Sequence, residues 1–154
     1  MTQPTASATE QTAHHVAQRV ADAMWSRDRA SRALGMKIVA VAPGRAELTM
    51  TVREDMLNGH DTCHGGFIFS LADSAFAFAC NSYNQVTVAS ACTIDFLAPV
   101  RAGDVLRAQA QEQSLTGRTG VYDILVTNAR DERVALFRGK SHRITGHVVD
   151  PAEL

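Results

Sequence analysis

The 154-residue sequence lacks the features that mark several common classes of protein. Its formal net charge is −1, so it has no basic excess of the kind that nucleic-acid-binding proteins carry. It contains no P-loop and no GxGxxG motif, which argues against the common nucleotide- and dinucleotide-binding sites. It also contains no internal repeat and no low-complexity linker, and its length suits one domain with its own core.

Export signals and membrane spans are also missing from the sequence. The N-terminus has no basic segment followed by an apolar run, so we expect no secretory signal. The most apolar stretch, residues 65–80, is too short for a membrane span and is interrupted by Asp73. Cysteine is scarce and odd in number: Cys63, Cys80 and Cys92 predict free thiols in a reducing compartment, which we take to be the cytoplasm.

The most distinctive stretch is residues 57–81, in which a loop rich in Gly, Asn and His precedes a long apolar run. Apolar residues recur there at helical spacing: Phe67, Ile68, Leu71, Ala72, Ala75, Phe76, Ala79 and Cys80. A helix that is apolar nearly all round is a buried one, and this one would be about 24 Å long. Asp73 is the only residue between Gly65 and Cys80 that can be charged, and burying an ionised carboxylate is costly unless something holds it.

The rest of the chain predicts one further helix and about six strands. The spacing of apolar residues predicts an amphipathic helix over residues 13–34, broken near Ser26–Asp28 and ended by Gly35. Alternation and turn residues predict strands over 36–42, 46–53, 86–97, 105–115, 121–127 and 134–144.

These elements predict an α+β fold in which a mostly antiparallel, twisted sheet wraps round one long central helix. Such a sheet would bury the apolar helix on all sides, as its composition demands. We predict one domain over residues 13–146. It is preceded by a disordered tail over residues 1–12, which are small and polar, and is followed by a short polar tail over residues 147–154.

Several motifs occur within this order of elements. They are Asn58-Gly59, His64-Gly65-Gly66, Leu71-Ala72-Asp73, Thr93-Ile94-Asp95-Phe96-Leu97 followed by Pro99, and residues 120–123 and 136–143. Together they resemble the hot-dog acyl-CoA thioesterases of the phenylacetate pathway, the PaaI type, over residues 33–144. The resemblance implies hydrolysis of phenylacetyl- or hydroxyphenylacetyl-type acyl-CoA by a homodimer or homotetramer, with no cofactor or metal besides the coenzyme A of the substrate.

The resemblance assigns the family's catalytic acid to Asp73. Thioester hydrolysis needs an activated water or a covalent anhydride, and one carboxylate can serve either route. The structural alternative is a buried Asp that is hydrogen-bonded to the backbone or to Ser70 and Ser74. The Gly65 N–H, alone or with that of Gly66, would polarise the thioester carbonyl at the positive end of the helix dipole. The two glycines would also suit a tight start to the helix.

The spacing of Gly65 and Asp73 predicts a site shared between two chains. The two residues lie about 12 Å apart along the helix axis. Both groups must come within about 3–3.5 Å of one carbonyl to act together, which one straight helix cannot achieve. Two helices side by side, related by a two-fold axis, can bring Gly65 of one chain to Asp73 of the other. This agrees with the resemblance, which implies active sites at a dimer interface.

Two loop residues and three hydroxyl residues complete the predicted centre of the site. The resemblance places Asn58 and His64 where they help to position the carbonyl or the water, whereas a turn role for Asn58-Gly59 is the alternative. A related branch of hot-dog thioesterases has a Thr one turn after its helical acid, where this chain has Ala77. The hydroxyl of Ser74 or of Ser90 is a candidate replacement, and Thr93 is a further candidate substrate-binding residue.

Basic residues near the end of the chain are candidates for binding the phosphates of coenzyme A. They are Arg138, Lys140 and Arg143 on the last predicted strand, together with Arg101. Outward alternation along that strand explains Arg138 and Lys140 equally well without a ligand.

Three other functions are weighed against the thioesterase. A zinc site at His60, Asp61, Cys63 and His64 is disfavoured because these ligand types crowd into five positions with no second pair elsewhere. A hot-dog hydratase or dehydratase would use a His with an acid, and His64 with Asp73 provides that pair in outline. An acyl-CoA sensor of this fold would carry a DNA-binding module, for which the first 35 residues are too short.

Overall fold

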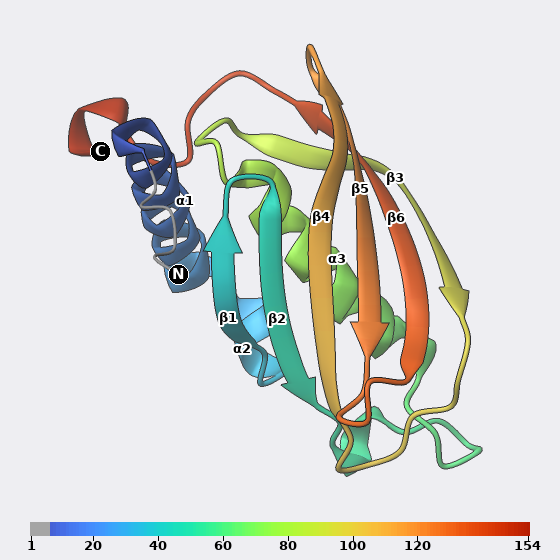
Figure 1. Ribbon diagram of the computed structural model, residues 1–154. Coiled ribbons are helices and arrows are strands. Elements are labelled where there is room, and N and C mark those ends of the chain that lie inside the picture. Colours follow the sequence, from blue (N-terminus) through green and yellow to red (C-terminus); the bar gives the residue numbers. More distant parts are fainter. Residues whose placement is uncertain (1–6) are drawn as a thin grey trace, which may run out of the picture.

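The computed structural model describes residues 7–154, which form a six-stranded antiparallel sheet with a long helix along one face (Figure 1). The strands run in the order β1 (Lys37–Ala42), β2 (Arg45–Thr51), β4 (Val105–Thr116), β5 (Thr119–Thr127), β6 (Arg133–Arg143) and β3 (Thr87–Phe96). The helix is α3 (Gly65–Asn81), which follows β2 in the chain. The predicted hot-dog arrangement is therefore confirmed.

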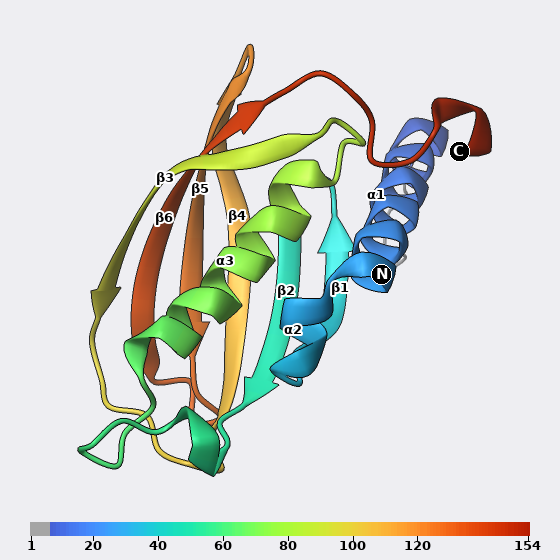
Figure 2. The ribbon, with the colours of Figure 1, turned by 180° about the vertical axis from the view of Figure 1, so that it is seen from behind.

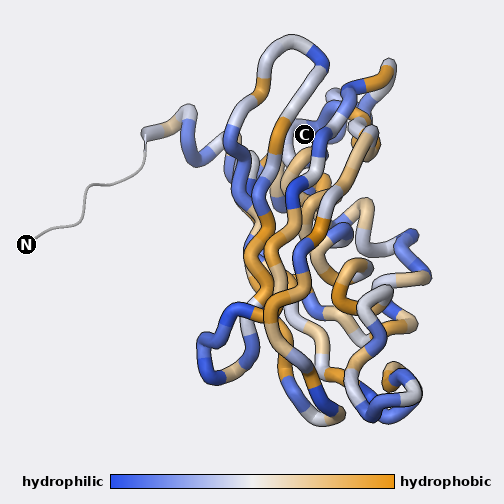
Figure 3. Tube along the Cα trace, turned by 90° about the vertical axis from the view of Figure 1, so that its right-hand side faces the viewer, coloured by the Kyte–Doolittle hydropathy of each residue, from blue (hydrophilic) through white to orange (hydrophobic). Residues whose placement is uncertain are grey.

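The alternation predicted for the second strand places one of its faces in the core. Ala46, Leu48 and Met50 of β2 are all at least 95% buried, and the residues between them are more exposed. Figure 3 shows hydrophobic residues along the strands and hydrophilic residues at the turns. The turn before β2 contains Gly44, whose φ of +69° is a conformation that glycine adopts without strain.

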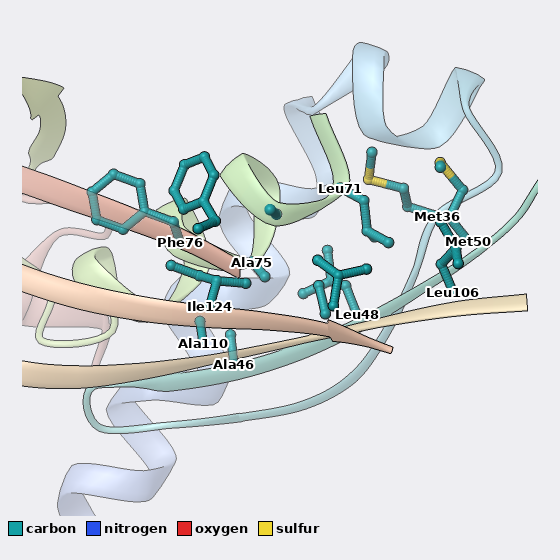
Figure 4. Close-up of a cluster of buried hydrophobic side chains, with 14 of the residues drawn as sticks. Met36, Ala46, Leu48, Met50, Leu71, Ala75, Phe76, Leu106, Ala110 and Ile124 are labelled. Atoms are coloured by element: carbon teal, nitrogen blue, oxygen red, sulfur yellow. The ribbon is translucent and has the colours of Figure 1, made fainter. Parts of the chain in front are cut away.

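Helix α3 packs its apolar face onto the concave side of the sheet. Leu71, Ala75 and Phe76 are essentially fully buried, and they face Leu48 and Ile124 of the sheet (Figure 4). Close packing of this kind stabilises the fold through burial of apolar area. No helix in the described part of the chain is both long and apolar enough to cross a membrane.

The expectation that the sheet buries α3 on all sides does not hold in the single chain. Gly66, Ser70, Asp73 and Ala77 recur at intervals of three or four positions, so they share one helix face. All four keep some exposure to solvent. The sheet covers one side of the helix, and Figure 2 shows the other side unobstructed. Asp73 therefore lies on an open face of α3 and not inside the core.

The N-terminal helix has the predicted break but begins earlier than predicted. It consists of α1 (Ala8–Arg27) and α2 (Arg29–Ala33), separated at Asp28. Ser7 caps α1 and forms a capping box with Glu10, which fixes the first turn. The prediction of disorder is thus wrong for residues 8–12, while residues 1–6 of the predicted tail lie outside the described residues.

The C-terminal segment is docked against the rest of the molecule. Asn84 and Val149 exchange two hydrogen bonds of 2.8 Å, and the side chain of Val149 is buried. A short 3₁₀ turn, η2 (Pro151–Glu153), follows near α1 (Figure 1). The predicted polar tail over residues 147–154 is therefore anchored at its Val149. The domain bounds at residues 13 and 146 stay a prediction.

Gly139 of β6 has no side chain, and the ring of Phe76 occupies the space where a side chain would lie. A Cβ atom on Gly139 would lie 2.8–2.9 Å from three ring atoms of Phe76. We predict that Gly139→Ala lowers the free energy of unfolding by about 1–3 kcal/mol because the core becomes overpacked. Denaturant unfolding measures this loss. Gly59→Ala is the control, since nothing lies within 4 Å of its added methyl group. Equal losses for the two variants would contradict the packing explanation.

Candidate active site

The loop before α3 is organised by the side chain of Asn58. Its Oδ1 accepts hydrogen bonds from His60 N at 2.9 Å, from Thr62 N at 3.4 Å and from Thr62 Oγ1 at 3.2 Å. A bridge between Leu57 and Cys63 closes the same loop. The Oδ1 atom of Asn58 therefore stabilises the turn, as the structural alternative predicted. Its Nδ2 has no hydrogen-bond partner among residues 7–154 and can donate to another group.

His64 is the N-cap of α3 and is exposed to solvent. Its Nδ1 accepts a hydrogen bond from the N–H of Gly66 at 2.9 Å. An accepting Nδ1 places the proton of the neutral ring on Nε2. His64 therefore presents an Nε2–H donor, and the N–H of Gly66 is already used.

The N–H of Gly65 is the open backbone donor at this end of the helix. No acceptor within residues 7–154 lies within hydrogen-bond distance of it. The first N–H groups of a helix have no partner within the helix, and the helix dipole adds a partial positive charge there. Of the two glycines proposed as donors, Gly65 is thus available, whereas Gly66 serves the cap.

Asp73 follows Gly65 by about two turns and lies on the open face of α3. No ion pair or hydrogen bond to its carboxylate is found in the described part of the chain. Partial burial alone raises the pKa of Asp73 above its usual value. Burial also raises the pKa of the Cys80 thiol, to about 12, and that of the Cys92 thiol, and the Asp73 charge adds to both shifts. The Asp73 charge therefore acts on a thiol of its own helix and on one of β3.

The hydroxyl of Ser74 belongs to a contact between helices. Ser31 Oγ donates to Asp28 Oδ2 at 2.6 Å, so it accepts from Ser74 Oγ at 2.9 Å. Ser70 Oγ donates to the carbonyl of Gly66 at 2.8 Å. Neither serine therefore forms a hydrogen bond to Asp73. The alternative in which Ser70 and Ser74 hold a buried Asp73 is wrong for these two side chains. The Ser74 hydroxyl thus has a partner in its own chain, and its role in binding the substrate stays a prediction.

The other two hydroxyl candidates are on β3 and away from Asp73. Ser90 lies at a β-bulge, where it donates to the carbonyl of Lys140 at 3.1 Å. Thr93 lines a groove of about 830 Å³ on the outer face of the sheet, opposite α3. Thr93 therefore cannot meet Asp73 of its own chain, because successive strand residues point to opposite faces.

The three basic candidates of β6 do not gather at one place. Arg138 Nε and Nη2 donate to the carboxylate of Asp123 at 2.6 and 2.8 Å, and this pair lies on the outer face. Lys140 is exposed on the same face. The guanidinium of Arg143 lies 5.4 Å from the ring centroid of Tyr83, near the C-terminal end of α3. Arg143 Nε is buried and has no hydrogen-bond partner among the described residues.

Residues of β3 that are not among the predicted site residues line the space beside α3. Cys92 and Ile94 pack against the core, and Phe96 continues this alternation on the same face. A Cβ atom on Gly65 would lie 2.9 Å from Cζ of Phe96, so the ring touches the start of α3. The alternation along β3 places these side chains on the face that meets α3 and Thr93 on the opposite face.

Within residues 7–154, no three His, Cys, Asp or Glu side chains are grouped so that they could hold a metal ion. The four residues weighed as a zinc site differ in environment. Cys63 is buried, while His60, Asp61 and His64 are exposed. The chemistry that the site offers is therefore that of an acid, a backbone donor and two side-chain donors.

The chain is similar in sequence and in structure to known thioesterases. The family model of the thioesterase superfamily matches residues 60–135. The chain is 54% identical to the acyl-coenzyme A thioesterase PaaI of Escherichia coli K12, an alignment that covers 90% of this chain and 99% of that enzyme. The structure of E. coli PaaI, a protein from the phenylacetic acid degradation operon, matches with a TM-score of 0.86. The two chains are 55% identical, over 87% of this chain and 97% of that one.

A second solved structure is also similar to the chain, at lower sequence identity. It is a mutant of the phenylacetic acid degradation protein PaaI from Thermus thermophilus. It matches with a TM-score of 0.74 and 42% identity, over 76% of this chain and 100% of that one. Both structures thus share the sheet and helix described above.

The raised pKa of Asp73 predicts a pH-dependent effect on stability. Its folded pKa lies above the unfolded value of about 3.9, so the folded state binds the proton more tightly. Ionisation of Asp73 therefore lowers stability as the pH rises through these values. We predict that Asp73→Asn unfolds at a higher denaturant concentration than the wild type at neutral pH, and that this advantage disappears below about pH 4.

Asp55→Asn is the matched control, because the pKa of Asp55 is shifted in the opposite direction to that of Asp73. A hydrogen bond from Arg53 lowers the pKa of Asp55, so its ionised form is favoured in the folded state. This control should be less stable than the wild type at neutral pH, with the difference lost at low pH. Both variants are measured at the same protein concentration. A stabilisation by Asp73→Asn that does not depend on pH would contradict the prediction.

Proposed function

Because the chain belongs to the PaaI-type acyl-CoA thioesterases of the hot-dog fold, we propose that it hydrolyses phenylacetyl- or hydroxyphenylacetyl-type thioesters to free acid and coenzyme A. One observation carries the proposal: an unpartnered Asp73 carboxylate lies on the open face of the helix that begins with the unpartnered N–H of Gly65. The aromatic acyl group is supported by the relative from the phenylacetic acid degradation operon.

In the proposed mechanism, the Gly65 N–H donates a hydrogen bond to the thioester carbonyl oxygen. Negative charge grows on this oxygen as the carbonyl carbon becomes tetrahedral, so the bond strengthens in the transition state. One such donor contributes about 3 kcal/mol to lowering the barrier. Asp73 either takes a proton from the attacking water or attacks the carbonyl carbon itself. The C–S bond then breaks, and the thiolate of coenzyme A leaves and is protonated. In the second route a water molecule then hydrolyses the resulting anhydride to the free acid and the Asp73 carboxylate.

We propose that the donor and the acid come from different chains of a homodimer. Helix α3 is continuous, so its own Gly65 and Asp73 stay about 12 Å apart. The open face of α3 and the edge strand β3 provide a surface that a second copy can cover. Val88 of β3 is an exposed apolar residue at this edge. Two such dimers forming a homotetramer complete the proposed assembly.

The remaining candidate residues take supporting roles in this proposal. Nε2–H of His64 and Nδ2 of Asn58 are donors that can orient the carbonyl oxygen or the water. Lys140 and Arg143 are proposed to meet the phosphates of coenzyme A, whereas Arg138 is already paired with Asp123. No cofactor is required by this chemistry. The free thiols of the chain support a cytoplasmic location.

A hydratase is the second candidate, and the tautomer of His64 disfavours it. Proton removal beside the carbonyl would need a basic imidazole nitrogen. Nδ1 of His64 accepts from Gly66, and Nε2 then carries the proton. A thiol assay separates the two reactions, because hydrolysis releases free thiol. Hydration of a 2,3-unsaturated acyl-CoA removes the enoyl absorbance without releasing thiol.

The role of Asp73 is tested by a change that keeps its shape. We predict that Asp73→Asn lowers kcat for phenylacetyl-CoA by at least about a hundredfold, because the amide can neither take the proton nor attack. Thiol release under substrate saturation measures kcat, and circular dichroism checks the fold. Asp55→Asn, at an exposed position outside α3, should keep wild-type turnover. A well-folded Asp73→Asn protein with normal turnover would remove Asp73 from the mechanism.

The shared site is tested by mixing two inactive variants. His64→Ala and Asp73→Asn are refolded together in equal amounts, and random pairing makes about half of the dimers mixed. If His64 of one chain serves Asp73 of the other, each mixed dimer has one site with both lesions and one intact site. Activity should then recover to about a quarter of the wild-type value. If each site lies within one chain, activity stays at baseline, although native mass spectrometry detects mixed dimers.

A further inference from the structure

The ring of Phe96 lies against the backbone donor at the start of α3. A Cβ atom on Gly65 would lie 2.9, 3.2 and 3.4 Å from Cζ, Cε1 and Cε2 of this ring. The outer edge of the ring therefore points at the position where Gly65 has no side chain. Only glycine allows this approach without displacing the ring, since real Cβ atoms do not come so close.

Phe96 is not held there as part of the core. Its side chain is 52% exposed at the end of the edge strand β3, so about half of the ring faces open space. A second aromatic residue lies nearby, because the rings of His64 and Phe67 meet edge-on at 6.2 Å. The start of α3 thus carries several aromatic rings, and Phe96, which contacts Gly65, is about half uncovered.

We propose that Phe96 is a specificity-determining residue that contacts the acyl group of the substrate and favours an aromatic one. The inference rests on the proposed function, in which the thioester carbonyl binds the Gly65 N–H. The acyl substituent begins one bond from that carbonyl. A ring that touches Gly65 is therefore within reach of the first atoms of the acyl group.

The chemistry of the contact favours aryl over short alkyl groups. Aromatic pairs with centroids about 4.5–7 Å apart gain an interaction beyond the area that they bury. A phenylacetyl group has one methylene between carbonyl and ring, which lets its ring turn onto Phe96. A butyryl group offers no such ring. Cys92 and Ile94 continue the same face of β3 and offer apolar surface but no aromatic ring.

The experiment compares two substrates on variants of Phe96. Phe96→Ala should lower the ratio of kcat/KM for phenylacetyl-CoA to that for butyryl-CoA by about tenfold, which corresponds to one lost aromatic contact. Phe96→Leu keeps an apolar side chain of similar bulk and should lower the same ratio to a smaller degree. Native mass spectrometry establishes the oligomeric state of each variant. If Phe96→Ala disturbs the assembly, the ratio measured for Phe96→Leu tests the proposal.

Leu97→Ala is the matched control, because Leu97 is the next residue and is 49% exposed. It should keep the wild-type ratio. An unchanged ratio in both Phe96 variants, or an equal change in Leu97→Ala, would overturn the role of Phe96 while leaving the thioesterase intact. A wild-type protein that releases no thiol from either substrate would overturn the proposed function and this inference with it.

Discussion

The packing of α3 against the concave face of the sheet is the interaction on which the other features depend. Leu71, Ala75 and Phe76 are buried there. Because side chains project at fixed angles from a helix, burying these residues also fixes which ones face away, and Asp73 is among them. The same helix keeps Asp73 about 12 Å from Gly65, whose N–H has no partner because it begins the helix. This rigidity makes a second chain necessary for the proposed chemistry.

The position of Asp73 opposes stability and favours reactivity. A carboxylate without a partner in the described chain is destabilised by partial burial, which raises its pKa. A carboxylate with a raised pKa is also a better proton acceptor when it is ionised. Perturbed groups of this kind cluster at functional sites. The neighbouring surface of β3 is apolar at Cys92 and Ile94, so it provides no charge that would offset the cost.

The sequence by itself determined the elements, their order and the choice of the residues proposed to carry the chemistry. Periodicity gave α3 and the strands within one or two residues, because spacing of apolar residues directly reflects which face is buried. The break at Asp28 and the loop at Asn58 were also predictable from local residue types. Gly65 and Asp73 could be chosen because a lone acid and paired glycines are conspicuous in an apolar run.

Only the tertiary structure decided how much of α3 is covered and which neighbours each polar group meets. The Ser74 hydroxyl contacts Ser31, which lies 43 positions earlier in the chain, and no local pattern around Ser74 indicates this partner. Thr93 and Phe96 lie on opposite faces of β3, and only the fold shows which of the two faces meets the helix. Such contacts join residues far apart in the chain, and local spacing carries no information about them.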